Sequence, residues 1–377
     1  MEKNNMNVRP LDPQRIPNNF RLQSYIEEEL TKANTIIKSE EHKKFTSNEL
    51  IDFGLIYLEI GNWDKAKSFY CEALTLEQAK PEYLQDKEVL ATVYYISATM
   101  KREKNNCLSA IKNYAIAEHL AQSDWLKSNI FRNLGLVYLK MADFEVAAKI
   151  FKQGLDFTNQ VIALRGSLPA FKNYYGLSLT RAALKNKQDP TEGLKTLEET
   201  TLLYGKIFLE KNVSETDQLK SHDFQSHQFH RGMILCEMAE HQDEDKAMSV
   251  QDKFQHAEQL LQGALAGRIA NKADEQRLGD TCAWLGRIYI GLKQIENAQQ
   301  YFEKALRYYQ TAFSNVPDAK QIKDVQTRLA GLKLFSKTEK ITPSLAKLSI
   351  LTQPPNETNN DANTRYAELR PTSATIG

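Results

Sequence analysis

Residues 129–157 read NIFRNLGLVYLKMADFEVAAKIFKQGLDF, and their pattern predicts two amphipathic helices joined by a short turn. The apolar face of the first helix comprises Phe131, Leu134, Gly135 and Tyr138, and that of the second Phe144, Ala147, Ala148, Phe151 and Leu155. A glycine inside a helix costs about 1 kcal/mol relative to alanine. Close approach of the other helix would offset that cost at Gly135, and we expect Ala147 to be the small residue opposite it.

The same spacing recurs along the chain. A small residue is followed twelve positions later by alanine, then by an aromatic residue four positions on and a small residue three after that. The twelve-residue pairs are Gly54–Ala66, Ala98–Ala110, Gly135–Ala147 and Gly286–Ala298. Two further hairpins depart in turn length, one through KNKQDPTEG and one through an insert near 240–252. Asp189 and Pro190 predict the start of the second helix in the former, and Asn62 is a predicted N-cap in the first hairpin.

These patterns predict an all-α chain built as one array. We expect a loose arm over 1–19, a capping helix over 20–46, six hairpins over 47–315, a second capping helix over 316–341 and a disordered tail over 342–377. The second capping helix is predicted from an apolar stripe that comprises Ile322, Val325, Leu329 and Leu332.

Composition excludes several classes of function. Lys and Arg total 49 and Asp and Glu 48, so no overall field attracts nucleic acid or an acidic membrane. The four cysteines are far apart, which indicates reduced thiols. No segment approaches 18 apolar residues and the first twenty contain no apolar run, so we expect no membrane span and no Sec-type signal. A cytoplasmic protein is predicted, with export by another route left open.

The repeated spacing resembles that of the tetratricopeptide repeat over roughly 48–310. Matched starts fall near 47, 91, 128, 169, 225 and 279, so the steps exceed the usual length of about 34 residues. Longer repeats of this kind resemble those of kinesin light chain and LGN-type scaffolds. The resemblance implies an α-solenoid, a right-handed superhelix whose first helices line a concave groove. It also implies that the groove binds a peptide or helix of a partner protein, without catalysis and without a cofactor.

The register of the repeat places a set of polar and apolar side chains in this expected groove. The set comprises Tyr95, Arg102, Asn129, Arg132, Asn133, Asn173, Leu177, Arg181 and Arg287. Arginine offers a fork for a carboxylate, and asparagine can pair with a peptide backbone. We therefore expect an acidic or extended segment to be gripped here; the alternative is that these residues form a solvated helix face.

Other candidate sites have weaker support. His222, His227 and His230 lie close in sequence, but no cysteine or acidic set completes a metal site. We therefore interpret them as histidines between helices or on the surface. No phosphate-binding loop, GxSxG or HExxH motif occurs. Three functions remain open: a scaffold or adaptor, a bacterial effector exported through its C-terminal tail, and a peptide-responsive regulator. The sequence does not determine the oligomeric state.

Overall fold

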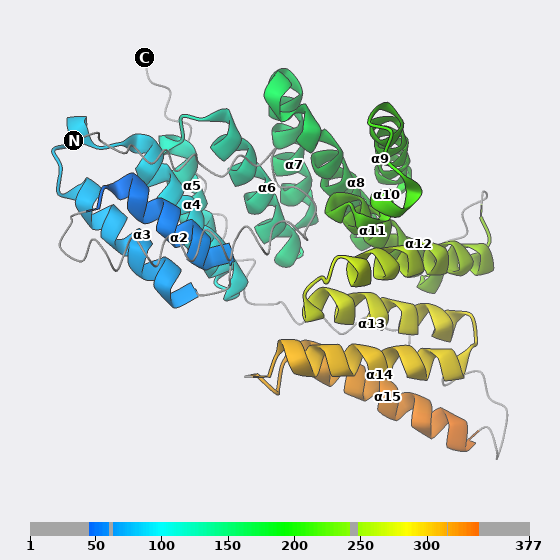
Figure 1. Ribbon diagram of the computed structural model, residues 1–377. Helices are drawn as coiled ribbons and strands as arrows, with labels where there is room; N and C mark the ends of the chain where they lie inside the picture. The colour runs from blue at the N-terminus through cyan, green and yellow to red at the C-terminus, as the bar shows by residue number, and fades with distance from the viewer. Residues whose placement is uncertain (1–44, 60–62, 242–247, 315, 339–377) are drawn as a thin grey trace. The chain divides into compact units, whose positions relative to one another are not determined.

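A computed structural model describes residues 45–59, 63–241, 248–314 and 316–338. The predicted arm, nearly all of the first capping helix, the Asn62 cap and the tail over 342–377 lie outside the described residues. Within them the chain forms fourteen α-helices and two short 3-10 helices, with no strand, which confirms the all-α prediction (Figure 1). None of the described helices is long and apolar enough to cross a membrane.

The helices follow one another in pairs. Their bounds are α2 Ser47–Glu59, α3 Trp63–Gln78, η2 Glu82–Leu84, α4 Lys87–Glu103, α5 Cys107–Leu120, α6 Asp124–Lys140, α7 Phe144–Gln160, η3 Ile162–Ser167, α8 Leu168–Lys185, α9 Thr191–Glu210, α10 Glu215–Lys220, α11 His222–Glu240, α12 Val250–Ala270, α13 Glu275–Gly291, α14 Ile295–Ala312 and α15 Lys320–Thr338. Helix α2 packs on α3, α4 on α5, α6 on α7, α8 on α9 and α13 on α14. Successive pairs are also in contact, since α3 packs on α4 and α14 on α15, which is the predicted α-solenoid architecture.

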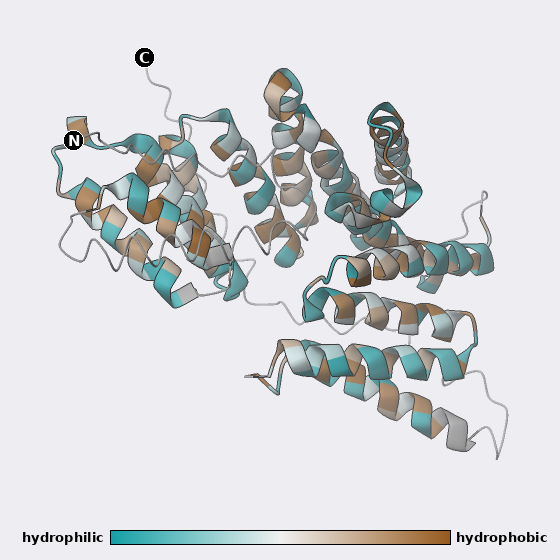
Figure 2. Cartoon of the chain, viewed as in Figure 1, coloured by the Kyte–Doolittle hydropathy of each residue, from teal (hydrophilic) through white to brown (hydrophobic). Residues whose placement is uncertain are grey.

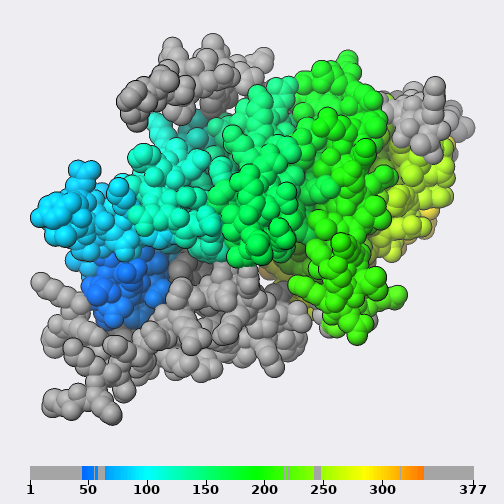
Figure 3. Space-filling view, turned by 90° about the horizontal axis from the view of Figure 1, so that it is seen from above, coloured from blue at the N-terminus to red at the C-terminus, as the bar shows by residue number. Residues whose placement is uncertain are grey.

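Contacts divide the chain into two compact units. The first comprises Met1–Met238 and Gln259–Ala273, and the second Ala239–Glu258 and Asp274–Gly377. Helices α11 and α12 therefore contribute to both units. Within the first unit, successive hairpins lie against one another in chain order (Figure 3).

Side-chain caps and left-handed residues fix where the helices begin and end. Asp86, Asn106, Ser123, Asp143 and Asp274 each accept a hydrogen bond from a backbone N–H in the first turn of the adjoining helix. Residues just after a helix adopt positive φ without being glycine, namely Asn105, Ala142, Lys187, Asn212, Lys272 and Lys293. Helix α9 begins one residue later than predicted, because Pro190 is its N-cap. Asp189 still accepts from the Thr191 N–H at 2.9 Å.

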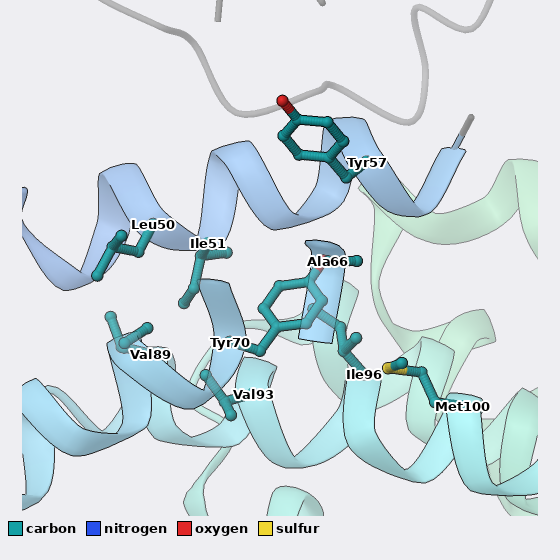
Figure 4. Close-up of a cluster of buried hydrophobic side chains, with 10 residues drawn as sticks. Leu50, Ile51, Tyr57, Ala66, Tyr70, Val89, Val93, Ile96 and Met100 are labelled. Atoms are coloured by element: carbon teal, nitrogen blue, oxygen red, sulfur yellow. The ribbon is translucent and has the colours of Figure 1, made fainter. Parts of the chain in front are cut away.

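Apolar and polar residues are interspersed along the helices (Figure 2), and α7 and α14 are strongly amphipathic. Figure 4 shows how the first hairpin is closed: Tyr70 and Ala66 of α3 lie between α2 and α4, and Val93 and Ile96 of α4 complete the cluster. The predicted apolar stripe of α15 is buried in the same manner, and it comprises Ile322, Val325, Leu329 and Leu332.

In the hairpins that contain Gly54, Gly135 and Gly286, the glycine lies under the aromatic residue sixteen positions later. A Cβ at Gly135 would come within 2.6 Å of the Phe151 ring, and one at Gly286 within 2.8 Å of the Phe302 ring. Ala147 is fully buried in the same cluster as Phe151, and the expectation that it is the small residue opposite Gly135 stays a prediction. An aromatic ring fills much of the space between two helices, and close packing there favours a small neighbour such as glycine or alanine.

This arrangement predicts opposite effects for two glycine substitutions. Gly135→Ala is expected to lower the free energy of unfolding by about 1–2 kcal/mol, because overpacking outweighs the gain in helix propensity. Gly205→Ala, in the middle of α9 where a Cβ meets nothing within 4 Å, is the matched control. It is expected to raise stability by about 0.5–1 kcal/mol. Urea unfolding followed by circular dichroism measures both, and an equal gain for the two variants would contradict the packing.

Candidate functional site

The predicted site residues lie on the first helices of the pairs, and several of them link one first helix to the next. We call the side of α4, α6, α8 and α11 that carries these links the first-helix face. Asn133 of α6 is buried, and its side-chain amide donates to the Tyr95 hydroxyl of α4 at 2.9 Å and to the Asn129 carbonyl at 2.9 Å. Its oxygen accepts from Arg102. The Asn133 amide is therefore used within the chain, where it holds α4 and α6 in register.

Arg102 is oriented by several contacts at once. Its guanidinium binds Glu103 through Nε at 3.0 Å and Nη2 at 2.5 Å, and its backbone carbonyl accepts from Lys140 Nζ at 3.0 Å. Only 15% of its side chain is exposed. Burial raises the pKa of Tyr95, although the charges of Arg132 and Arg102 act in the opposite direction, so the hydroxyl stays protonated. The Tyr95 hydroxyl and the Arg102 guanidinium thus both hold the Asn133 side chain of α6 in place.

The outer surface of α6 carries a row of three more accessible side chains: Trp125, Asn129 and Arg132. The Trp125 side chain is 41% exposed, and its carbonyl accepts from Asn129 Nδ2 at 3.0 Å. Asn129 in turn accepts from Arg132 Nη2 at 2.9 Å. Among the described residues no carboxylate lies within ion-pair distance of Arg132. We call these three residues the α6 row; Trp125 was not predicted, although it lies one turn before Asn129 on the same stripe.

Asn173 of α8 lies between two histidines of α11. Its side-chain oxygen is 3.0 Å from His227 Nδ1, and its nitrogen is 2.8 Å from His230 Nδ1. His227 Nε2 lies 2.8 Å from the Thr201 hydroxyl of α9. Asn173 is 1% exposed, so it cannot touch a partner as it lies here. Asn173 therefore links two hairpins, and His227 and His230 have a structural role as its partners.

Both histidines are held neutral. Burial, followed by the charge of Arg231, lowers the pKa of His227 to about 3. Burial, followed by the charges of Arg268 and Arg181, lowers the pKa of His230 well below its usual value. The described residues contain no group of three or more acidic, histidine or cysteine side chains able to hold a metal ion. His222 stands apart, exposed beside Asp223.

The two remaining predicted arginines are already paired with acids of α11. Arg181 binds Glu237 at 2.7 Å and also lies 3.2 Å from the Met233 sulfur. Arg287 binds both carboxylate oxygens of Glu240, with Nε at 3.0 Å from Oε1. Its guanidinium stacks 3.8 Å from the Trp284 ring. Leu177, the last predicted residue, is buried in the core of its hairpin.

Glu237 and Glu240 were missed by reasoning from the sequence. They follow Met233, a residue at the predicted register, by four and seven positions, so helical spacing alone could have placed them on the same face. Their effect is to pair Arg181 of α8 and Arg287 of α13, whereas Arg132 of α6 has no carboxylate within ion-pair distance among the described residues. The arrangement offers hydrogen bonds, one available guanidinium and an indole ring, which are the groups of a binding surface.

Together these features define a helical-repeat protein whose first helices carry polar side chains. Two segments, 50–80 and 279–311, match the sequence pattern described as tetratricopeptide repeat, and they correspond to α2–α3 and α13–α14. Tetratricopeptide repeats are thus present in these two segments, as predicted. The narrower likeness to kinesin light chain and LGN-type scaffolds stays a prediction.

Solved structures agree with this fold. A chain of the APC/C hetero-tetramer Cut9–Hcn1 is similar with a TM-score of 0.50 and 13% identity, covering 84% of this chain and 50% of that one. The apo form of the quorum sensor NprR from B. thuringiensis is similar with a TM-score of 0.50 and 12% identity, covering 88% of this chain and 84% of that one. The chain therefore spans about half the length of the first of these relatives. No curated protein matches in sequence. At these identities the similarity shows the fold alone.

Proposed function

We propose that the chain is a non-catalytic scaffold that binds an extended or helical segment of a partner protein on its first-helix face. The observation that carries this proposal is the α6 row, in which a half-exposed tryptophan lies one turn from an asparagine and two turns from an arginine without a carboxylate partner among the described residues. Trp and Arg are the residues most enriched among those that dominate protein interfaces. Members of the tetratricopeptide family bind protein segments on the corresponding helices.

The chemistry of the row specifies the segment. The free edge of the Arg132 guanidinium fits a carboxylate through two parallel hydrogen bonds. The Trp125 ring offers an apolar surface for an aliphatic or aromatic side chain about two helical turns away. We therefore expect the bound segment to combine one acidic and one large apolar side chain. The paired residues Arg102 and Arg181 support the face and contribute less to the contact.

A peptide array tests this proposal. The labelled full chain is expected to bind a subset of acidic, apolar-containing peptides, and Arg132→Glu is expected to weaken that binding by about tenfold or more, since a charge-assisted pair becomes a repulsion. Arg165→Glu is the matched control. It reverses the same charge at an exposed position of η3, outside the first-helix face, and should leave binding unchanged.

Two results would reject the α6 row as the binding site. One is unaltered peptide binding by Arg132→Glu, and the other is an equal loss for Arg132→Glu and Arg165→Glu. Trp125→Ala gives an independent measurement, with a comparable loss expected and unchanged helical content as the check that the fold is intact.

A second candidate function is regulation by a peptide, supported by the pairing between α8 and α11. The Arg181–Glu237 pair is partly accessible, with 24% and 20% of the two side chains exposed, so an acidic segment could replace Glu237. Replacement would loosen one contact between successive first helices. Small-angle scattering with and without a bound peptide tests this, and identical curves would count against it. Export through 342–377, a cytoplasmic location and the absence of nucleic-acid binding stay predictions.

A further inference from the structure

The asparagine amides of the first-helix face are largely used inside the chain. Asn133 is buried, and its amide donates to two oxygen atoms of the chain and accepts from a guanidinium. Asn173 is 1% exposed and lies between two histidines. The Asn129 nitrogen donates to the Trp125 carbonyl, and its oxygen accepts from Arg132. An extended segment, which must find partners for its backbone groups, would therefore meet few of them on this face.

The spacing of the α6 row also suits one kind of segment. Trp125 and Arg132 are seven residues apart on α6, which is about 10.5 Å along the helix axis. Two residues seven positions apart on a second helix share one face and have the same separation. On an extended strand, residues that share a face are about 6.6 Å or about 13 Å apart, so neither spacing matches. A polyproline II segment comes closer, with about 9 Å for three residues, but its backbone groups have no internal partners.

We infer that the segment bound by the α6 row is an α-helix that lies along α6 and carries a large apolar residue and an acidic residue seven positions apart. A helix satisfies most of its own backbone hydrogen bonds, so it needs only side-chain contacts from this face. Its carboxylate binds the Arg132 guanidinium, and its apolar side chain covers the Trp125 ring. This inference rests on the proposed function and narrows the bound segment from extended or helical to helical.

A second apolar side chain lies at the Trp125 end of the row. Ile162 is 75% exposed and begins η3, which is in contact with α6. In the antiparallel hairpin α6–α7 the Ser128 hydroxyl lies 3.5 Å from the Thr158 hydroxyl. Trp125 is three residues before Ser128 and residue 161 is three after Thr158, so Ile162 begins at the level of Trp125 along the hairpin. Ile162 extends the apolar end of the row, and we therefore expect the bound helix to place a leucine or a larger side chain there.

Fluorescence anisotropy of three kinds of labelled peptide with the full chain tests the inference. The first is alanine-based, is held helical by a hydrocarbon staple on its far side, and carries leucine and glutamate seven positions apart. It is made in both orders, because the bound helix can run parallel or antiparallel to α6. The second differs only in a five-position spacing, which puts the two residues on different sides of the helix. The third is proline-rich, with the two residues three positions apart.

The seven-position helix is expected to bind, in one of its two orders, at least about tenfold more tightly than the other two kinds of peptide. Arg132→Glu is expected to weaken that binding by about tenfold or more, and Ile162→Asp by about fivefold. A peptide with lysine in place of glutamate is expected to bind Arg132→Glu more tightly than the intact protein, because the signs of the pair are exchanged. Leu84→Asp is the matched control for Ile162→Asp, since Leu84 is 59% exposed on η2, and it should leave binding unchanged.

The possible failures are distinguishable. Binding that depends on Arg132 but favours the proline-rich peptide or the five-position spacing would overturn the helical inference and leave the proposed function in place. No binding by any peptide, or binding that Arg132→Glu leaves unchanged, would overturn both. Equal effects of Ile162→Asp and Leu84→Asp would overturn the contact assigned to Ile162. Helical content and thermal stability confirm that each variant is folded.

Discussion

Replacing Phe151 with alanine is expected to lower the free energy of unfolding by about 3–5 kcal/mol, the usual range for removing a fully buried aromatic ring. The Phe151 side chain is 0% exposed and fills the space over Gly135, so no neighbouring side chain can close the cavity without moving a helix. Its ring also stacks on Tyr174 of α8 at 5.2 Å and 15°. The substitution therefore weakens the hairpin α6–α7 and its contact with the next hairpin together.

Hydrogen exchange is the appropriate measurement, because repeats contact mainly their neighbours and a global transition would average over them. Protection is expected to fall most in α6, α7 and α8. Tyr83→Ala is the matched control, since this aromatic residue is 84% exposed and its removal should change stability by less than about 0.5 kcal/mol. A uniform fall in protection, or a loss no larger than that of Tyr83→Ala, would contradict the role assigned to Phe151.

Acidification from pH 7 to pH 5 is expected to lower the free energy of unfolding by about 2 kcal/mol through His227 and to lower it further through His230. Both pKa values are lowered in the folded state, to about 3 for His227 and well below the ordinary value for His230. Below the unfolded pKa of about 6.5 the unfolded chain binds more protons, so stability rises with pH in this range. The contribution is complete above that pKa and is lost as the pH falls toward the folded values.

The hydrogen-bond pattern gives a reason that does not depend on the orientation of the Asn173 amide. The amide has one acceptor and one donor end, and a ring nitrogen of His227 or His230 faces each. Whichever way the amide is turned, one Nδ1 must lack a proton. Charging that histidine would place two donors face to face, next to the positive charges of Arg181 and Arg268 that already act on His230.

Variants separate this pair from the other histidines. His230→Asn is expected to lower stability at pH 7 and to reduce the slope of stability against pH by about half between pH 6.5 and pH 5, because one titrating group remains. His119→Gln removes an exposed histidine of α5 and should leave the slope as in the intact protein. An unchanged slope in His230→Asn would show that other groups govern the acid response.

The sequence predicts the hairpins well because their packing is local. Gly135, Ala147 and Phe151 lie within seventeen residues, so helical spacing alone brings them together. The candidate site was harder to predict, since its contacts join helices far apart in the chain. Asn173 meets His230 fifty-seven residues away, and Arg181 meets Glu237 fifty-six residues away. Register gives the face of a helix, but it does not say which residue on the next first helix will neutralise a charge there.

The glycine and the aromatic ring that covers it belong to one hairpin, and this bears on how the chain folds during synthesis. A sixteen-residue separation makes the contact between the glycine and the ring local, and local contacts favour rapid folding. Each hairpin can therefore close soon after its second helix leaves the ribosome. Its remaining apolar surface is covered when the next helix emerges, as α4 covers the first hairpin. Vectorial folding of this kind keeps only about one hairpin's apolar surface open to aggregation at any moment.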